Sequence, residues 1–127
     1  MMKILAAGFV VSALTLGALG AFAAAMEPAK MGVTSKGKAW TDLKGMTLYT
    51  FKKDTATKSN CNGECATEWP PLAVAADGKA AGNWTIVTRD DGTKQWALKG
   101  KPLYLWIKDK KPGDATGEGL DGFHIAK

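Results

Sequence analysis

The chain has 127 residues, of which 17 are lysine or arginine and 12 are aspartate or glutamate, so its formal net charge is +5 at pH 7. This length suits one domain with a modest core and leaves no room for a second. The lysines are spread along the chain and mixed with acidic residues, which excludes the clustered basic stripe of a nucleic-acid-binding protein.

Residues 1–25 have the pattern of a secretory signal peptide. Lys3 gives a positive start, residues 4–22 are apolar and small, and residues 21–25 contain small-x-small cleavage sites. The alternative is an uncleaved anchor helix, because the apolar run is nearly long enough to span a bilayer. Its glycine and alanine content makes it weakly hydrophobic, so we favour cleavage, which leaves no stable membrane anchor. We therefore expect a periplasmic or secreted protein whose basic surface meets an envelope polymer or a protein partner.

The first part of the remaining chain carries few large apolar residues. We expect residues 26–38 to form a flexible lead, with Met31–Thr34 joining a sheet edge. After it, residues 39–43 and 46–51 have high strand propensity. They flank the pair Lys44-Gly45, which predicts a hairpin.

The segment from residue 55 to residue 72 has no strand or helix periodicity and is rich in Ser, Asn, Cys, Gly and Pro. Asn62 is a suitable cap for a single helical turn over residues 63–68. Pro70 and Pro71 then end that turn.

The only two cysteines of the chain, Cys61 and Cys65, lie four residues apart in this segment. They share one side of the predicted turn, within reach of a disulfide if the first cysteine precedes the helix. An oxidising compartment favours that bond. Closing so short a ring stabilises the fold by roughly 2 kcal/mol, so the disulfide shapes the loop more than it holds the domain together.

The second half of the chain predicts a three-stranded meander. Residues 84–89 and 93–98 flank Asp90-Asp91-Gly92, the strongest hairpin signal in the chain. A further turn leads into a strand over residues 102–107, whose proline suits a strand start. A last short strand is expected over residues 123–126.

One seven-residue stretch occurs twice, as LYTFKKD at Leu48–Asp54 and LYLWIKD at Leu103–Asp109. Residues two apart share a face of a strand, so each copy presents a pair of aromatic rings on one face. The aspartate follows where the strand ends, and its carboxylate can accept backbone N–H groups there. The repeat motif therefore consists of Tyr49, Phe51 and Asp54 in one copy and Tyr104, Trp106 and Asp109 in the other.

These elements predict an all-β fold. We expect a small antiparallel domain of hairpins and a meander over residues 39–127, with one short helical turn near the cysteines. It contains two pseudo-repeats, unit one at about residues 40–72 and unit two at about residues 84–127. The two units are expected to pack their aromatic faces together.

The chain resembles a bacterial family of secreted proteins and predicted lipoproteins with a repeated Tyr-x-aromatic-x-x-Asp motif and no known function. The resemblance implies export and a β-rich repeat, and it implies no established reaction or ligand. Many relatives start with a lipid-modified cysteine, and this chain departs from that pattern. Besides the two motif copies, the likeness rests on Ser59-Asn60-Cys61-Asn62-Gly63, Cys65-Ala66, Trp69-Pro70-Pro71-Leu72, Asp91-Gly92, Gln95-Trp96, Gly100-Lys101-Pro102-Leu103-Tyr104 and Pro112-Gly113-Asp114.

The sequence offers two candidate metal sites. Cys61, Cys65 and His124 form a soft ligand set suited to copper or zinc, but their spacing matches no recognised metal pattern and a disulfide would remove both thiolates. The glycine-rich loop before the last strand offers oxygen ligands for calcium, although turn-forming roles explain its acids better. Those acids are Asp109, Asp114, Glu118 and Asp121. We expect neither a metal nor another cofactor.

Five tryptophans are many for a domain of this size. Trp40, Trp96 and Trp106 are expected in the core, which otherwise has few large aliphatic residues. Trp69 and Trp84 are the candidates for exposed ligand contacts, because aromatic rings on a rigid β surface can stack on sugars or grip a partner.

Catalysis has little support in the sequence. The lone histidine, His124, lies among apolar residues and suits packing better than proton transfer. No local motif joins it to a nucleophile. We therefore expect a non-enzymatic binding or interaction module of the bacterial envelope. The alternative is a periplasmic metal-binding or electron-transfer protein that uses Cys61, Cys65 and His124.

Overall fold

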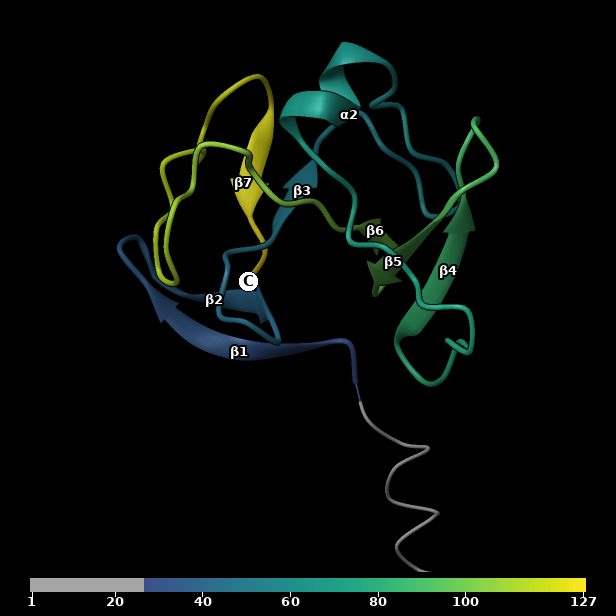
Figure 1. Ribbon diagram of the computed structural model, residues 1–127, viewed down its shortest axis with the longest axis horizontal. Coiled ribbons are helices and arrows are strands. Elements are labelled where there is room, and N and C mark those ends of the chain that lie inside the picture. The colour runs from purple at the N-terminus through teal and green to yellow at the C-terminus, as the bar shows by residue number, and fades with distance from the viewer. Residues whose placement is uncertain (1–26) are drawn as a thin grey trace, which may run out of the picture.

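The computed structural model describes residues 27–127, which form seven short strands and one helical turn (Figure 1). The predicted signal peptide, residues 1–25, lies outside this range. In residues 27–127 no helix is long and apolar enough to cross a membrane. The elements are β1 (Ala29–Thr34), β2 (Gly37–Asp42), β3 (Tyr49–Phe51), α2 (Glu64–Glu68), β4 (Trp84–Thr88), β5 (Lys94–Leu98), β6 (Lys101–Pro102) and β7 (Phe123–Ile125).

The predicted flexible lead over residues 26–38 is wrong, because Ala29–Thr34 forms β1 and β2 begins at Gly37. This strand pairs antiparallel with β2 from Ala29 opposite Asp42 to Thr34 opposite Gly37. The Thr34 hydroxyl closes the turn: it donates to the carbonyl of Gly37 and accepts from the N–H of Lys36. The expected sheet edge is confirmed. Its strand pattern is hidden in the sequence, since the central residues of β1 are largely exposed.

The remaining strands form two further small antiparallel sheets. One contains β4, β5 and β6 in that order, which confirms the predicted meander. The turn between β5 and β6 has positive φ at both Lys99 (51°) and Gly100 (79°), as a tight hairpin turn requires. The other sheet joins β3 to the final strand β7, with Tyr49 opposite Ile125 and Phe51 opposite Phe123. The first repeat unit thus pairs with the end of the second.

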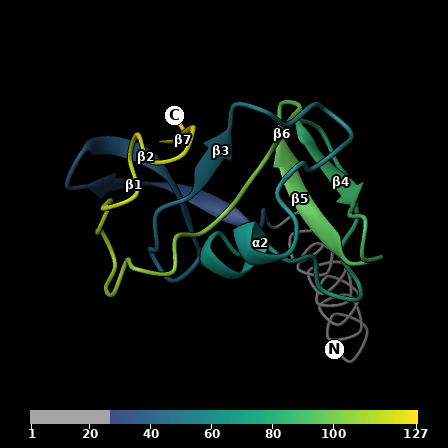
Figure 2. The ribbon, with the colours of Figure 1, turned by 90° about the horizontal axis from the view of Figure 1, so that it is seen from above.

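The two motif tyrosines pair with each other through their main chains. The N–H of Tyr49 donates to the carbonyl of Tyr104 at 2.8 Å, and the N–H of Tyr104 donates back at 2.9 Å. The predicted strands over residues 46–51 and 102–107 are correspondingly shorter in the structure, because regular pairing stops around this contact. Two views show the meander on one side of the molecule and β1, β2, β3 and β7 on the other (Figures 1 and 2).

The core has two aromatic clusters, and it includes both tryptophans predicted to be surface contacts. Trp69 is 1% exposed and Trp84 is 6% exposed, so the prediction that these rings face solvent is wrong. Both lie in otherwise polar or small-residue surroundings in the sequence, and distant segments cover them. Trp96 and Trp106 are buried as expected, and Trp40 is partly buried against the second cluster.

The helical turn near the cysteines is confirmed, but its predicted cap is not. α2 begins at Glu64 after Gly63, whose positive φ of 60° suits glycine, and no side chain caps it. The Asn62 side chain instead donates to the Asp90 carboxylate at 3.2 Å. That contact joins the cysteine loop to the turn between β4 and β5.

Candidate functional site

The two copies of the repeat motif join the two halves of the molecule by exchanging side-chain hydrogen bonds. The Tyr49 hydroxyl donates to the Asp109 carboxylate at 2.7 Å, and the Tyr104 hydroxyl donates to the Asp54 carboxylate at 2.5 Å. Each tyrosine therefore bonds to the aspartate of the other copy. The second oxygen of each aspartate accepts a backbone N–H, from Asn60 for Asp54 and from Thr116 for Asp109, which confirms the turn role expected of these acids.

Burial keeps both phenols protonated. It raises the pKa of Tyr104 to about 12, and the hydrogen bond to the Asp54 carboxylate adds to the shift. The pKa of Tyr49 is raised further by burial and by its bond to Asp109. Burial also raises the pKa of Asp54 above its usual value. The two hydroxyls thus act as donors over the whole physiological pH range.

Four aromatic rings form a continuous stack in which the two repeat units alternate. Phe51 stacks on Phe123 with ring centroids 4.3 Å apart, and Phe123 stacks on Trp69 at 3.8 Å. Trp69 in turn stacks on Trp106 at 4.1 Å. Phe51 and Trp69 belong to unit one, and Phe123 and Trp106 belong to unit two. The stack therefore runs from the motif aromatic of one copy to that of the other.

A glycine packs against two rings of this stack. A Cβ atom on Gly117 would lie 2.7 Å from Cη2 of Trp69 and 2.9 Å from Cγ of Trp106. The main chain can pass this close to the two indoles only without a side chain. Gly117 therefore packs against both indoles, and Trp106 is 8% exposed.

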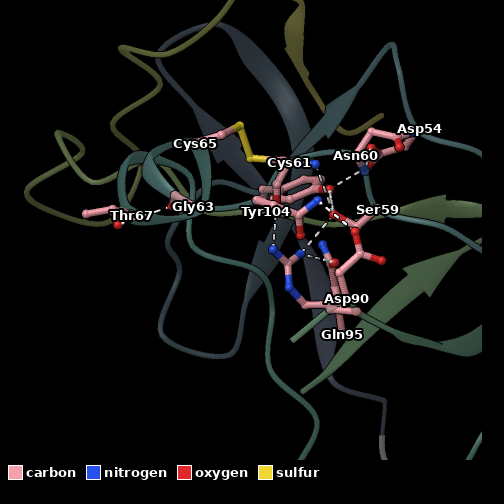
Figure 3. Close-up of a disulfide and its surroundings, with 12 residues drawn as sticks. Asp54, Ser59, Asn60, Cys61, Gly63, Cys65, Thr67, Asp90, Gln95 and Tyr104 are labelled. Atoms are coloured by element: carbon pink, nitrogen blue, oxygen red, sulfur yellow. Dashed lines mark hydrogen bonds between the residues drawn. A yellow bond between two sulfur atoms is a disulfide. The ribbon is translucent and has the colours of Figure 1, made fainter. Parts of the chain in front are cut away.

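The predicted disulfide is confirmed. Cys61 and Cys65 are bonded, with their Cα atoms 5.2 Å apart, beside a network of buried polar side chains (Figure 3). Arg89 is 4% exposed and lies at the centre of this network. Its guanidinium donates to the Cys61 carbonyl at 2.6 Å, to Gln95 at 2.6 Å and to Ser59 at 2.9 Å.

This network also supports one of the exchanged bonds. The Ser59 hydroxyl lies 2.6 Å from the Tyr104 hydroxyl, and Gln95 donates to the carbonyl of Leu103 at 2.7 Å. Sequence reasoning missed the role of Arg89. The available signal was its position directly before the Asp-Asp-Gly turn, where alternation along the strand turns its side chain inward.

The residues proposed as soft metal ligands are not gathered into one site. Cys61 and Cys65 are bonded to each other, and the imidazole of His124 pairs with the Glu118 carboxylate at 2.6 Å. His124 is exposed, because Phe123 and Ile125 take the inward positions of β7, so the packing role expected for it is wrong. Across the part of the chain that the structure describes, no three potential metal-binding side chains form a cluster.

The acids of the glycine-rich loop make local hydrogen bonds. Asp114 accepts the N–H groups of Lys110 and Lys111, and these bonds lower its pKa. Asp109 is occupied by Tyr49 and by both donors of Thr116. These contacts favour the turn-forming interpretation over the calcium hypothesis.

A cleft of about 610 Å³ opens where the β3–β7 sheet meets the turn between β5 and β6. Sequence reasoning did not locate it, because its walls come from segments far apart in the chain. Its apolar wall includes two partly buried aromatic residues, Trp40 and Phe51. Its cationic side chains are Lys52, Lys99, Lys101 and Lys127.

Fold and site together define a small two-repeat β-protein whose halves exchange hydrogen bonds. A family model described as a secreted repeat of unknown function matches residues 30–73 and 85–124, and the chain belongs to this family. The two matches correspond to the two repeat units deduced from the sequence. No curated protein and no solved structure matches the chain.

Proposed function

We propose that the protein is a non-enzymatic binding module that acts in the bacterial envelope, in the periplasm or after secretion, and that its ligand site is the cleft. The observation that carries this proposal is the gathering of four lysines around the junction of the repeat units. The repeat motif has a different role, since its tyrosines and aspartates bond to each other inside the protein. The tyrosines and aspartates of the motif build the frame, and the cleft presents the binding groups.

The charge of the cleft favours an anionic ligand. Asp54 is the one acidic side chain among the lining residues, and it already accepts hydrogen bonds from Tyr104 and Asn60. In residues 27–127 none of the four cleft lysines forms an ion pair. Their ammonium groups are free to meet carboxylate, phosphate or sulfonate oxygens of an envelope component or a partner.

The test uses 8-anilinonaphthalene-1-sulfonate, an anionic dye whose fluorescence rises in an apolar site. We expect the protein to bind it, and we expect the triple variant Lys52→Gln, Lys101→Gln, Lys127→Gln to bind it about tenfold more weakly, since each exposed charge contributes up to about 1 kcal/mol. Lys99 is left unchanged because its φ of 51° constrains replacement.

The matched control removes the same charge elsewhere, through Lys36→Gln, Lys79→Gln and Lys94→Gln. These lysines are exposed and lie outside the cleft. The control should keep the affinity and melting temperature of the original protein. Equal losses in both triple variants, or no binding by the original protein, would overturn the proposal.

A further inference from the structure

The aromatic stack indicates the chemistry of the ligand, an inference that rests on the proposed function. The stack ends at Phe51, and Phe51 also lines the cleft. One face of its ring lies on Phe123, with an angle of 7° between the planes. Phe123 is in turn parallel to Trp69 within 3°. Trp69 and Phe51 must therefore cover opposite faces of Phe123, which leaves Phe51 as the terminal ring.

Among residues 27–127, no second aromatic ring stacks on the outer face of Phe51. Tyr104 is perpendicular to both phenylalanines, but its ring centroid is 5.3 Å from Phe123 and 6.5 Å from Phe51. A ring above the end of the stack would be nearer to Phe51, so Tyr104 lies beside the stack. Phe51 remains partly exposed, whereas Trp106 at the other end is 8% exposed. The stack thus ends at a partly exposed ring whose residue lines the cleft.

We propose that the cleft binds a planar aromatic anion whose ring continues the stack on Phe51 and whose acidic group meets the cleft lysines. Offset-parallel packing on an aromatic face favours a flat ring over a flexible chain. The lysines supply the complementary charge for a carboxylate, phosphate or sulfonate. The volume of about 610 Å³ falls in the range of sites for small organic ligands.

An aliphatic anion is the closest rival ligand. It would satisfy the same lysines and contact the same apolar wall, and it would gain nothing from the terminal ring. Comparing the two classes at constant charge isolates the contribution of stacking. A neutral aromatic alcohol isolates the contribution of the lysines.

The experiment is calorimetric titration with naphthalene-1-sulfonate, octane-1-sulfonate and 1-naphthalenemethanol. We expect the aromatic anion to bind about fivefold more tightly than the aliphatic anion, as one additional stacked ring pair predicts. The neutral ring should bind about tenfold more weakly than the aromatic anion. Ring protons of the bound naphthalene should shift upfield in NMR spectra, which reports stacking without any substitution.

Two variants test the role of Phe51. Phe51→Tyr keeps a ring at the end of the stack and should keep the preference for the aromatic anion, whereas Phe51→Leu should bring the ratio of the two affinities close to one. If neither anion binds the original protein, the proposed function fails. If both bind equally and the naphthalene signals do not shift, the proposed function stands and the stacking inference is wrong.

Discussion

The two exchanged tyrosine–aspartate pairs have the same chemistry and different surroundings. In one pair, Asp109 accepts the Tyr49 hydroxyl together with both donors of Thr116, so local chain in the glycine-rich loop completes the site. That carboxylate accepts three hydrogen bonds and is 7% exposed. The Gly117 N–H also lies 3.2 Å from the Tyr49 hydroxyl.

In the other pair, distant segments complete the site. Tyr104 bonds to Asp54 and lies beside Ser59, which Arg89 holds from the meander. The Cys61 carbonyl accepts from the same guanidinium, so side-chain hydrogen bonds tie the disulfide loop to this pair, whereas the loop reaches Tyr49 through the packing of Trp69. The comparison shows that the motif residues make the same tyrosine–aspartate hydrogen bond in both pairs, while different loops provide the other hydrogen bonds around each pair. The repeat units differ again at the stack ends, where Phe51 is partly exposed and lines the cleft, whereas Trp106 is 8% exposed.

Replacing each aspartate with asparagine should give the largest difference between the two pairs. Asp109→Asn should lower the free energy of unfolding by about 3 kcal/mol. The asparagine amide would place an N–H donor where the carboxylate now accepts three hydrogen bonds. Asp54→Asn should cost only about 1 kcal/mol, because burial already penalises the charged carboxylate and raises its pKa. Urea denaturation of both variants measures the difference. Equal losses, or a larger loss for Asp54→Asn, would show that the surroundings do not decide the effect.

Reducing the disulfide should act more strongly on the Tyr104–Asp54 pair than on the Tyr49–Asp109 pair. The chain-entropy model gives a loss of about 2 kcal/mol for so short a ring. Because Cys61 bonds to Arg89, and Arg89 bonds to Ser59 beside Tyr104, we expect larger NMR shifts of the Tyr104 ring than of the Tyr49 ring, which the loop reaches only through packing of Trp69. Urea denaturation with and without a phosphine reductant gives the energy. Comparable shifts in both rings would contradict the stronger connection of the disulfide loop to the Tyr104–Asp54 pair.

Alkaline titration compares the two pairs directly, because the chain has only two tyrosines. The folded pKa of Tyr104 is raised from 10.0 to about 12, so the neutral phenol is favoured on folding. Its contribution to stability is complete below pH 10 and is lost as the pH rises towards 12. Tyrosinate absorbance of the native protein should appear first from Tyr104 and later from Tyr49. Tyr104→Phe should remove the earlier step, and an ordinary titration near pH 10 would contradict burial of the hydroxyls.

Local signals in the sequence predicted the parts of the fold that local chemistry determines. The turn at Asp90-Asp91-Gly92, the meander and the disulfide all follow from neighbouring residues. The burial of Trp69 does not, because it depends on Phe123 and Trp106 from the other repeat unit. The exchange of hydrogen bonds between copies likewise depends on long-range contacts. The sequence of one copy does not indicate whether its tyrosine bonds to its own aspartate or to that of the other copy.

The cleft was hidden from sequence reasoning for the same reason. Lys52 follows β3 and Lys101 lies in β6, in different repeat units, and the main-chain pairing of Tyr49 with Tyr104 brings these segments to one opening. In the sequence, lysines that lie far apart look like ordinary solvated surface residues. The fold brings four of these lysines together around the cleft.

Double-mutant cycles on the motif test the exchange most directly. The cycles combine Tyr49→Phe or Tyr104→Phe with Asp54→Asn or Asp109→Asn, and urea denaturation gives the coupling energies. The structure predicts coupling of about 1–2 kcal/mol for Tyr49 with Asp109 and for Tyr104 with Asp54, and near zero for the two pairs within a copy. Coupling within the copies, with none between them, would show that each repeat unit closes on itself and that the exchange is wrong.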